Sequence, residues 1–188
     1  MYQVNEIFYS LQGEGYHTGR AAVFVRMAGC NLRCTFCDTD FAHGEPMSAE
    51  HIAERVFSYS TDPNTLIVLT GGEPTLQVDE ALTEALHRHG QTIAIETNGT
   101  HPVAKGVDWI TVSPKSGAPV VLERADELKL VMTEQTESEI QKWLTAVEAK
   151  HYYLQPCSCK NTAEVVQYIQ HHPEWRLSLQ THKYIGIQ

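Results

Sequence analysis

The sequence predicts an α/β fold, and three observations support this prediction. Short apolar runs rich in β-branched residues recur along the chain, with helical stretches between several of them. A polar turn follows most of these runs. The chain has 188 residues, of which 42% are hydrophobic and 20% charged, enough to bury one sizeable core. Strands are expected at residues 22–27, 66–69, 92–95, 109–112, 128–132, 152–154 and 177–179.

Helices are expected between several of these strands. Ser48 is a suitable N-cap for a helix that runs to about Tyr59, and Asp79 for one that ends before Gly90. Residues 136–149 and 162–171 carry apolar side chains at helical spacing. Because no internal repeat, low-complexity tract or long linker interrupts the chain, residues 1–188 are expected to form a single domain.

Charge and hydropathy exclude several classes of protein. Acidic residues outnumber basic ones by 23 to 14, and the formal net charge of −9 disfavours binding to nucleic acid or to an anionic membrane. No apolar run approaches the roughly 20 residues that a membrane span needs. The N-terminus lacks a basic segment followed by an apolar one. We therefore expect a cytoplasmic protein with no direct nucleic-acid or membrane partner.

Polar turns, two of which contain glycine, gather where the predicted strands end. In parallel α/β sheets and barrels the ligand site lies at the carboxyl ends of the strands, so these turns are expected to converge on one site. They lie at residues 70–74, 96–100, 113–115, 155–156 and 180–183.

Three of the five cysteines form a C-x3-C-x2-C loop, Cys30, Cys34 and Cys37, directly after the first predicted strand. Three thiolates can hold three irons of a [4Fe–4S] cluster and leave the fourth iron open to a small ligand. A non-catalytic zinc module is the alternative. A structural zinc site needs a further ligand pair, whereas only the single histidines His17 and His43 lie nearby.

The cysteine loop, with an aromatic residue before its last cysteine and the downstream segment Gly71-Gly72-Glu73-Pro74, resembles the radical S-adenosylmethionine (SAM) superfamily. The resemblance implies a [4Fe–4S] cluster on the three cysteines and bound SAM as cofactors. It also implies that Gly72 and Glu73 bind the methionine amino group and that Phe36 flanks the adenine. A glycine backbone permits close approach to a ligand, and a carboxylate can accept from an ammonium.

A narrower resemblance covers almost the whole chain. Residues 11–15, 37–39, 96–100, 113–115 and 180–183 are similar to segments of the 7-carboxy-7-deazaguanine synthase family. That family converts 6-carboxy-5,6,7,8-tetrahydropterin to 7-carboxy-7-deazaguanine, a step towards queuosine and other deazapurines. The resemblance implies a shortened, partial (β/α)6 barrel, a homodimer, Mg²⁺ and an electron donor such as flavodoxin.

The same resemblance assigns the remaining site residues. Arg26 is expected to offer a forked partner to the substrate carboxylate, and Thr39 to bind Mg²⁺ together with substrate oxygens and water. Substrate contacts are implied for Leu11, Gln12, Gly13, Glu14, Arg26, Thr70 and His182. Contacts to SAM are implied for Phe36, Gly72, Glu73, Ser113, Pro114, Lys115, Gln155, Pro156, Cys157 and Ser158. Cys157 and Cys159 are too few for a second cluster and are interpreted as free thiols or incidental redox partners.

The implied reaction is a radical ring contraction in which a hydrogen atom is removed from C6 of the pterin and ammonia is later lost. An activase that generates a glycyl radical on a partner protein is the second candidate, since such enzymes are short and share the cysteine loop. The polar segment at residues 11–15 and Arg26 favour a small carboxylated heterocycle instead.

Overall fold

The computed structural model describes residues 1–188 and contains one sheet of nine strands in the order β3-β1-β2-β4-β5-β6-β7-β8-β9. From β2 to β9 every neighbouring pair is parallel, whereas β1 pairs antiparallel with both β2 and β3. The two ends of the sheet do not pair with each other, so the fold is a partial barrel, as the family resemblance implied. The strands are β1 (Tyr2–Leu11), β2 (Ala21–Met27), β3 (Glu45–Met47), β4 (Leu66–Gly71), β5 (Ile93–Thr97), β6 (Trp109–Val112), β7 (Arg124–Met132), β8 (Glu148–Pro156) and β9 (Arg176–Leu177).

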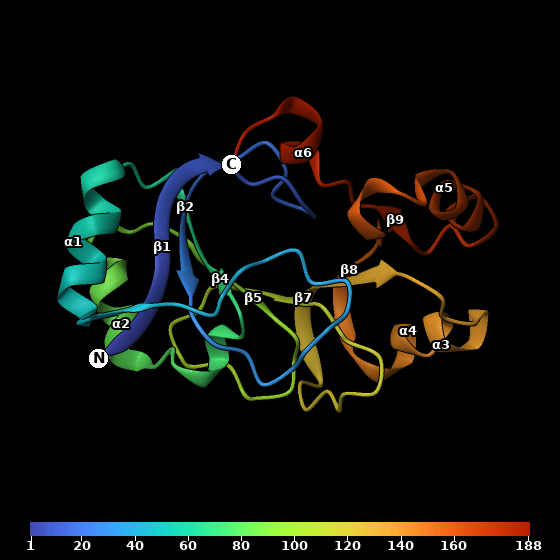
Figure 1. Cartoon of the computed structure of the whole chain (residues 1–188), viewed down its shortest axis with the longest axis horizontal. Helices are drawn as coiled ribbons and strands as arrows, with labels where there is room; N and C mark the ends of the chain where they lie inside the picture. The colour runs from blue at the N-terminus through green and yellow to red at the C-terminus, as the bar shows by residue number, and fades with distance from the viewer.

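Short helices cover the two ends of this sheet. Figure 1 shows α1 and α2 beside β1, and α3, α4 and α5 beside β8 at the opposite end. Ser48 and Asp79 cap α1 and α2 with their side chains, as predicted. The helices are α1 (Ala49–Tyr59), α2 (Glu80–Leu86), α3 (Glu137–Gln141), α4 (Trp143–Ala146), α5 (Thr162–His171) and α6 (Thr181–Ile185), and short 3-10 turns lie at Pro74–Leu76, His87–His89 and Cys157–Cys159.

Alternation along the central strands separates the hydrophobic core from the site. In β2, Val23, Val25 and Met27 belong to the largest apolar cluster, which packs against α1 and α2. Ala22 and Phe24 point to the other face of the sheet, where they pack in a smaller cluster. Farther along the same face, Arg26 and its register partner Thr70 on β4 line a cavity. The inner face is therefore apolar at one end and polar at the carboxyl end of the strands.

The predicted helix over residues 136–149 is interrupted at Lys142 and ends at Ala146, so the prediction is wrong only for its last three residues and for its continuity. Two short helices occupy residues 137–146, and β8 then begins at Glu148, which pairs with Arg124 of β7. Parallel pairing along the whole of β7 outweighs the local helical spacing of these residues. A second apolar cluster, which includes Ile140, Val147 and Leu154, packs the two short helices against β8.

Three elements had no counterpart in the sequence prediction: β1, β3 and α6. Buried and exposed residues alternate along only part of β1, because a register irregularity between Val4 and Glu6 interrupts the alternation. Strand β3 and helix α6 have three and five residues, too few for a periodic pattern.

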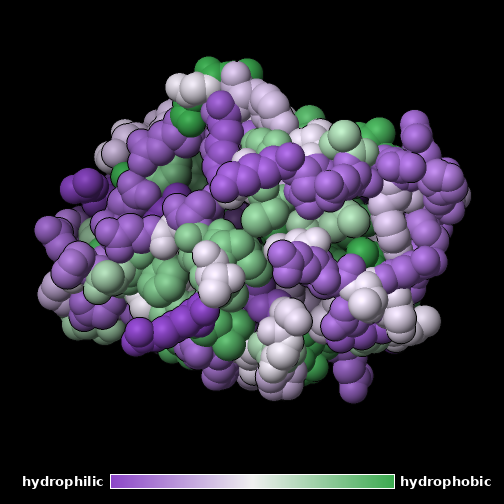
Figure 2. All heavy atoms as spheres, turned by 45° about the vertical axis from the view of Figure 1, so that its right-hand side comes forward, coloured by the Kyte–Doolittle hydropathy of each residue, from purple (hydrophilic) through white to green (hydrophobic).

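No helix has both the length and the apolar character that crossing a membrane requires. Figure 2 shows hydrophilic side chains over most of one face, with a band of more hydrophobic residues across its middle.

Candidate active site

A cavity of about 350 Å³ opens at the carboxyl ends of the parallel strands. Seven segments of the chain contribute to its wall. One precedes β2, five follow β2, β4, β5, β6 and β8, and the last is the C-terminal segment. The five polar turns predicted to converge therefore do so. Of the predicted site residues, the cavity brings together Leu11, Gln12, Gly13, Glu14, Arg26, Cys30, Cys34, Phe36, Cys37, Thr39, Thr70, Gly72, Ser113, Lys115, Gln155, Pro156, Cys157, Ser158 and His182.

The three clustered cysteines line this cavity, and their thiols are free. Burial raises the pKa of the Cys30 thiol, although the N–H of Leu32 donates to its sulfur at 3.4 Å. No group of three Cys, His, Asp or Glu side chains is arranged to hold a single metal ion. Three free thiols on one loop that face a common cavity are a donor set suited to a [4Fe–4S] cluster with one open iron.

The glycine turn after β4 lies against the start of the cysteine loop. The N–H of Gly72 donates to the carbonyl of Met27 at 3.0 Å, and the N–H of Glu73 to that of Gly29 at 2.9 Å. A Cβ atom at Gly72 would lie 1.9 Å from the Gly29 oxygen, so only glycine permits this approach. The glycine pair thus joins the two motifs by direct backbone contact.

Glu73 is not among the residues that line the cavity, so the contact of its side chain with the cofactor amino group stays a prediction. Its carboxyl group is fully buried. One oxygen accepts from the backbone and hydroxyl of Thr75 and from the Thr97 hydroxyl, at 3.1, 2.6 and 2.6 Å. The other accepts from the N–H of Asn98 at 2.7 Å. These bonds commit the carboxyl group to holding the β4 and β5 turns together.

The Asn98 side chain extends this connection to the cysteine loop. Its Nδ2 donates to Oδ1 of Asn31 at 3.0 Å, and Asn31 in turn donates to the Thr100 hydroxyl at 2.8 Å. Because Asn31 directly follows Cys30, the β5 turn constrains the start of the cysteine loop.

Pro114 is the second predicted residue outside the cavity wall, whereas its neighbours Ser113 and Lys115 face inward. The Lys115 ammonium donates to the Ser113 hydroxyl at 2.6 Å and to its carbonyl at 2.7 Å. Burial lowers the pKa of Lys115. This leaves a desolvated cation at the cavity wall, suited to an anionic group of a ligand.

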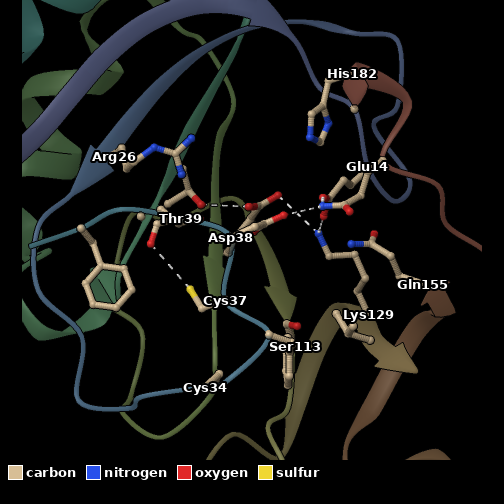
Figure 3. A pocket seen from close by; sticks show the side chains of 18 of the residues that line it. Glu14, Arg26, Cys34, Cys37, Asp38, Thr39, Ser113, Lys129, Gln155 and His182 are labelled. Atoms are coloured by element: carbon tan, nitrogen blue, oxygen red, sulfur yellow. Dashed lines mark hydrogen bonds and ion pairs between the residues drawn. The ribbon is translucent and has the colours of Figure 1, made fainter. Parts of the chain in front are cut away.

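A charged cluster that the sequence did not reveal lines another part of the cavity wall. It consists of Glu14, Glu96 and Lys129 (Figure 3 labels Glu14 and Lys129). The Lys129 ammonium contacts the Glu14 carboxylate and lies 3.7 Å from Glu96. Gln12 and Thr70, predicted to touch the substrate, donate to Glu96 at 3.1 and 2.9 Å. Lys129 was missed because it sits in an apolar run, 128–132, that reads as a buried strand.

Arg26 and Thr39 lie on the side of the cavity away from Lys129 (Figure 3). Nε of Arg26 donates to Glu6 at 2.7 Å, and the guanidinium lies over the Phe8 ring. The ion pair uses Nε and leaves the two terminal nitrogens for a ligand. His182 lies over Gly13, where an added Cβ would lie 2.2 Å from its ring nitrogen.

Comparison with known proteins identifies the class of this chain. The family model described as the radical SAM superfamily matches residues 24–149. The 7-carboxy-7-deazaguanine synthase of Bacteroides thetaiotaomicron is 50% identical over 188 residues, which is 100% of both chains. The enzyme of the same name from Bordetella pertussis is 48% identical over 209 residues, covering 99% of each chain. A crystal structure of QueE from Escherichia coli superposes with a TM-score of 0.78 at 31% identity, covering 96% of this chain and 94% of that one.

The chain therefore belongs to the radical SAM superfamily, with the open sheet and three-cysteine cavity described above. Its full-length similarity to several relatives places it, within that superfamily, among the 7-carboxy-7-deazaguanine synthases. The zinc-module alternative is not supported.

Replacement of Glu73 by Gln is expected to lower the free energy of unfolding by about 1–3 kcal/mol. The amide nitrogen is a donor and would replace a carboxylate oxygen that accepts hydrogen bonds from buried donors. Urea unfolding of Glu73→Gln measures this loss. The exposed Glu84→Gln is the matched control and should stay within about 0.5 kcal/mol of the wild type. Equal stability of the two variants would contradict the bracing role of Glu73.

The buried carboxyl group of Glu127 is expected to make the free energy of unfolding depend on pH. Burial raises the pKa of this carboxyl group from 4.5 to about 7, although Lys129 and the N–H of Tyr16 oppose the shift. The unfolded chain thus loses this proton first, and the stability falls as the pH rises from about 4.5 to 7. Glu127→Gln should remove this fall and gain about 2–3 kcal/mol relative to the wild type between pH 5 and 8.

Urea unfolding at several pH values tests this expectation, with the exposed Glu123→Gln as the control. An unchanged pH profile in Glu127→Gln would show that the carboxyl group does not titrate in this range.

Proposed function

We propose that this chain converts 6-carboxy-5,6,7,8-tetrahydropterin to 7-carboxy-7-deazaguanine with loss of ammonia, the reaction that the family resemblance implies. The observation that carries the proposal is the single cavity that joins the three free cysteines to a pocket with Arg26 on one side and Glu14, Glu96 and Lys129 on the other. The whole chain, residues 1–188, then acts as one radical SAM domain.

The residues present fit the cofactors of this reaction. Cys30, Cys34 and Cys37 would hold the [4Fe–4S] cluster. Gly72, Ser113 and Lys115 line the adjoining wall, where SAM would bind. When bound, the cluster and SAM together supply the radical chemistry that removes a hydrogen atom from the substrate.

Later residues of the chain complete the SAM region. Phe36 would flank the adenine, and the turn after β8 presents Gln155, Pro156, Cys157 and Ser158 to the same cavity. A hydroxyl such as that of Ser158 suits a ribose, because it can donate and accept.

The substrate pocket offers complementary groups for a carboxylated pterin. The terminal nitrogens of Arg26 can bind the substrate carboxylate as a fork. Thr39 would bind Mg²⁺ together with oxygen atoms of the substrate and water. Glu14 and Glu96 would accept from the N–H groups of the ring, and Leu11, Gly13 and His182 would close the pocket above it.

Gln12 and Thr70 take a modified role in this proposal. Gln12 donates to Glu96 and accepts from the N–H of Glu14 at 3.1 Å, so both functions of its amide are already engaged. These two side chains orient the Glu96 carboxylate, while their backbone and remaining surface line the pocket.

The glycyl-radical activase is not favoured. An activase must admit a segment of a partner protein, whereas His182 and Lys183 of α6 line the cavity and the helix is bonded to Gly13 and Asp38. The N–H and hydroxyl of Thr181 donate to the Gly13 carbonyl, each at 2.9 Å, and Lys183 forms an ion pair with Asp38.

Anaerobic incubation of the cluster-reconstituted protein with dithionite, SAM, Mg²⁺ and the carboxytetrahydropterin tests the proposal. We expect 7-carboxy-7-deazaguanine by mass spectrometry, and deuterium placed at C6 should appear in SAM or 5′-deoxyadenosine. Omission of Mg²⁺ should reduce the rate. If 5′-deoxyadenosine accumulates without the product, the substrate is wrong, and a colourless protein containing zinc would contradict the cluster as well.

We also propose that the protein works as a homodimer and receives electrons from a small donor protein such as flavodoxin. Support comes from the family resemblance and from large apolar side chains that the single chain leaves exposed, including Tyr9, Tyr16, Tyr184 and Ile185. Sedimentation velocity should give a species of twice the chain mass of 21.1 kDa. A species of single-chain mass at micromolar concentration would contradict the dimer.

A further inference from the structure

Lys129 occupies the wall of the cavity but has no role in the reaction outlined above. It lies on β7, and its side chain is only 6% exposed. A buried lysine is rarely found without a partner. Here the ammonium contacts Glu14 and lies 3.7 Å from Glu96, so one cation bridges two carboxylates of the proposed substrate pocket.

The two carboxylates come from different parts of the chain. Glu14 belongs to the segment between β1 and β2 and accepts from Nε2 of Gln180, at the start of α6, at 2.9 Å. Glu96 lies on β5 and accepts from Gln12 and Thr70. Lys129 therefore connects β7 to β5, to the β1–β2 segment and, through Glu14, to the C-terminal helix.

The charges around this cluster keep Lys129 protonated. Burial alone would lower the pKa of its ammonium, but Glu14, Glu96 and Glu127 raise it well above its usual value. Burial alone would raise the pKa of Glu14, but the charge and hydrogen bond of Lys129 lower it to about 2. Lys115, after β6, adds a second positive charge nearby. A lysine held in this way is a fixed charge and not a proton donor at neutral pH.

The pterin ring of the proposed substrate carries adjacent N–H donors on its 2-amino-4-oxopyrimidine edge. An ionised carboxylate accepts such a pair through both oxygens, whereas a protonated carboxyl group presents a competing donor. Without a cation, two carboxylates within one buried pocket would repel each other and take up a proton. The pocket thus needs a compensating charge that does not itself occupy the substrate's place.

We propose that Lys129 is a positioning residue, which holds Glu14 and Glu96 ionised and oriented so that they accept from the 2-amino-4-oxopyrimidine edge of the substrate. This inference rests on the proposed function, because it assigns the carboxylates to the pterin.

Substrate affinity, measured without turnover, tests the inference. Anaerobic calorimetry with SAM and Mg²⁺ but no reductant gives the Kd of the carboxytetrahydropterin between pH 6 and 9. For Lys129→Met we expect a Kd at pH 7 at least about tenfold above that of the wild type, because charged hydrogen bonds are lost. The loss should be largest at pH 6 and smaller at pH 9, where the carboxyl groups regain their charge.

Two variants separate positioning from a general structural effect. Lys129→Arg keeps the charge and should recover most of the affinity, with little dependence on pH. Lys150→Met removes an exposed lysine that pairs with Asp126 and should bind like the wild type. Iron content and the unfolding midpoint of each variant identify samples that have not folded.

A double variant, Glu14→Gln with Lys129→Met, covers the case in which the single Met variant does not fold, because it removes the buried pair together. It should also bind the pterin at least about tenfold more weakly than the wild type. Affinity within twofold of the wild type in either folded variant would overturn the inference. So would an affinity loss that is equal in Lys129→Arg and Lys129→Met and independent of pH.

The two proposals fail in different ways. If the wild type neither binds nor converts the pterin, the proposed function falls and this inference falls with it. If the wild type binds and converts the pterin while Lys129→Met binds it equally well, only the role of Lys129 is overturned.

Discussion

The close backbone approach between the turn after β4 and the end of β2 is the constraint on which the rest of the site depends. Two hydrogen bonds, from Gly72 and Glu73 to Met27 and Gly29, join the glycine turn to the chain that enters the cysteine loop. A side chain at position 72 would collide with the Gly29 carbonyl. The buried carboxyl group of Glu73 then ties the same turn to β5. These contacts fix the distance between the cysteine loop, proposed to hold the cluster, and the glycine turn, proposed to bind SAM.

The parallel register of the strands also aligns the polar side chains of the pocket across the sheet. Arg26 and Thr70 are register partners on β2 and β4, and Glu96 aligns through Thr111 with Glu127 on β7. Side chains alternate between faces along a strand, so these polar groups share the inner face while their neighbours fill the core. A strand that is apolar on one face and charged on the other can then serve both the core and the pocket.

Charge inside the cavity is balanced locally, although the chain as a whole is acidic. Lys129 and Arg26 lie on different sides of the cavity (Figure 3), and Lys115 also lines it. Each cation has a protein partner, Glu14, Ser113 and Glu6 respectively. Desolvation would otherwise make such charges costly, and the partners keep them in place before a ligand binds. The pocket is thus prepared for an anionic substrate without a broad positive surface.

The sequence by itself determined the α/β class, the strands of the parallel sheet, two helix caps and the cysteine and glycine motifs of the cavity wall, because apolar periodicity, capping and short motifs are local signals. Strand β8 overrode a helical pattern at Glu148 because pairing with β7 depends on residues more than 20 positions away. The burial of Glu73 and the cluster of Glu14, Glu96 and Lys129 were likewise decided only by tertiary structure. Distant strands must come into register before these groups meet, and no spacing along the chain records that contact.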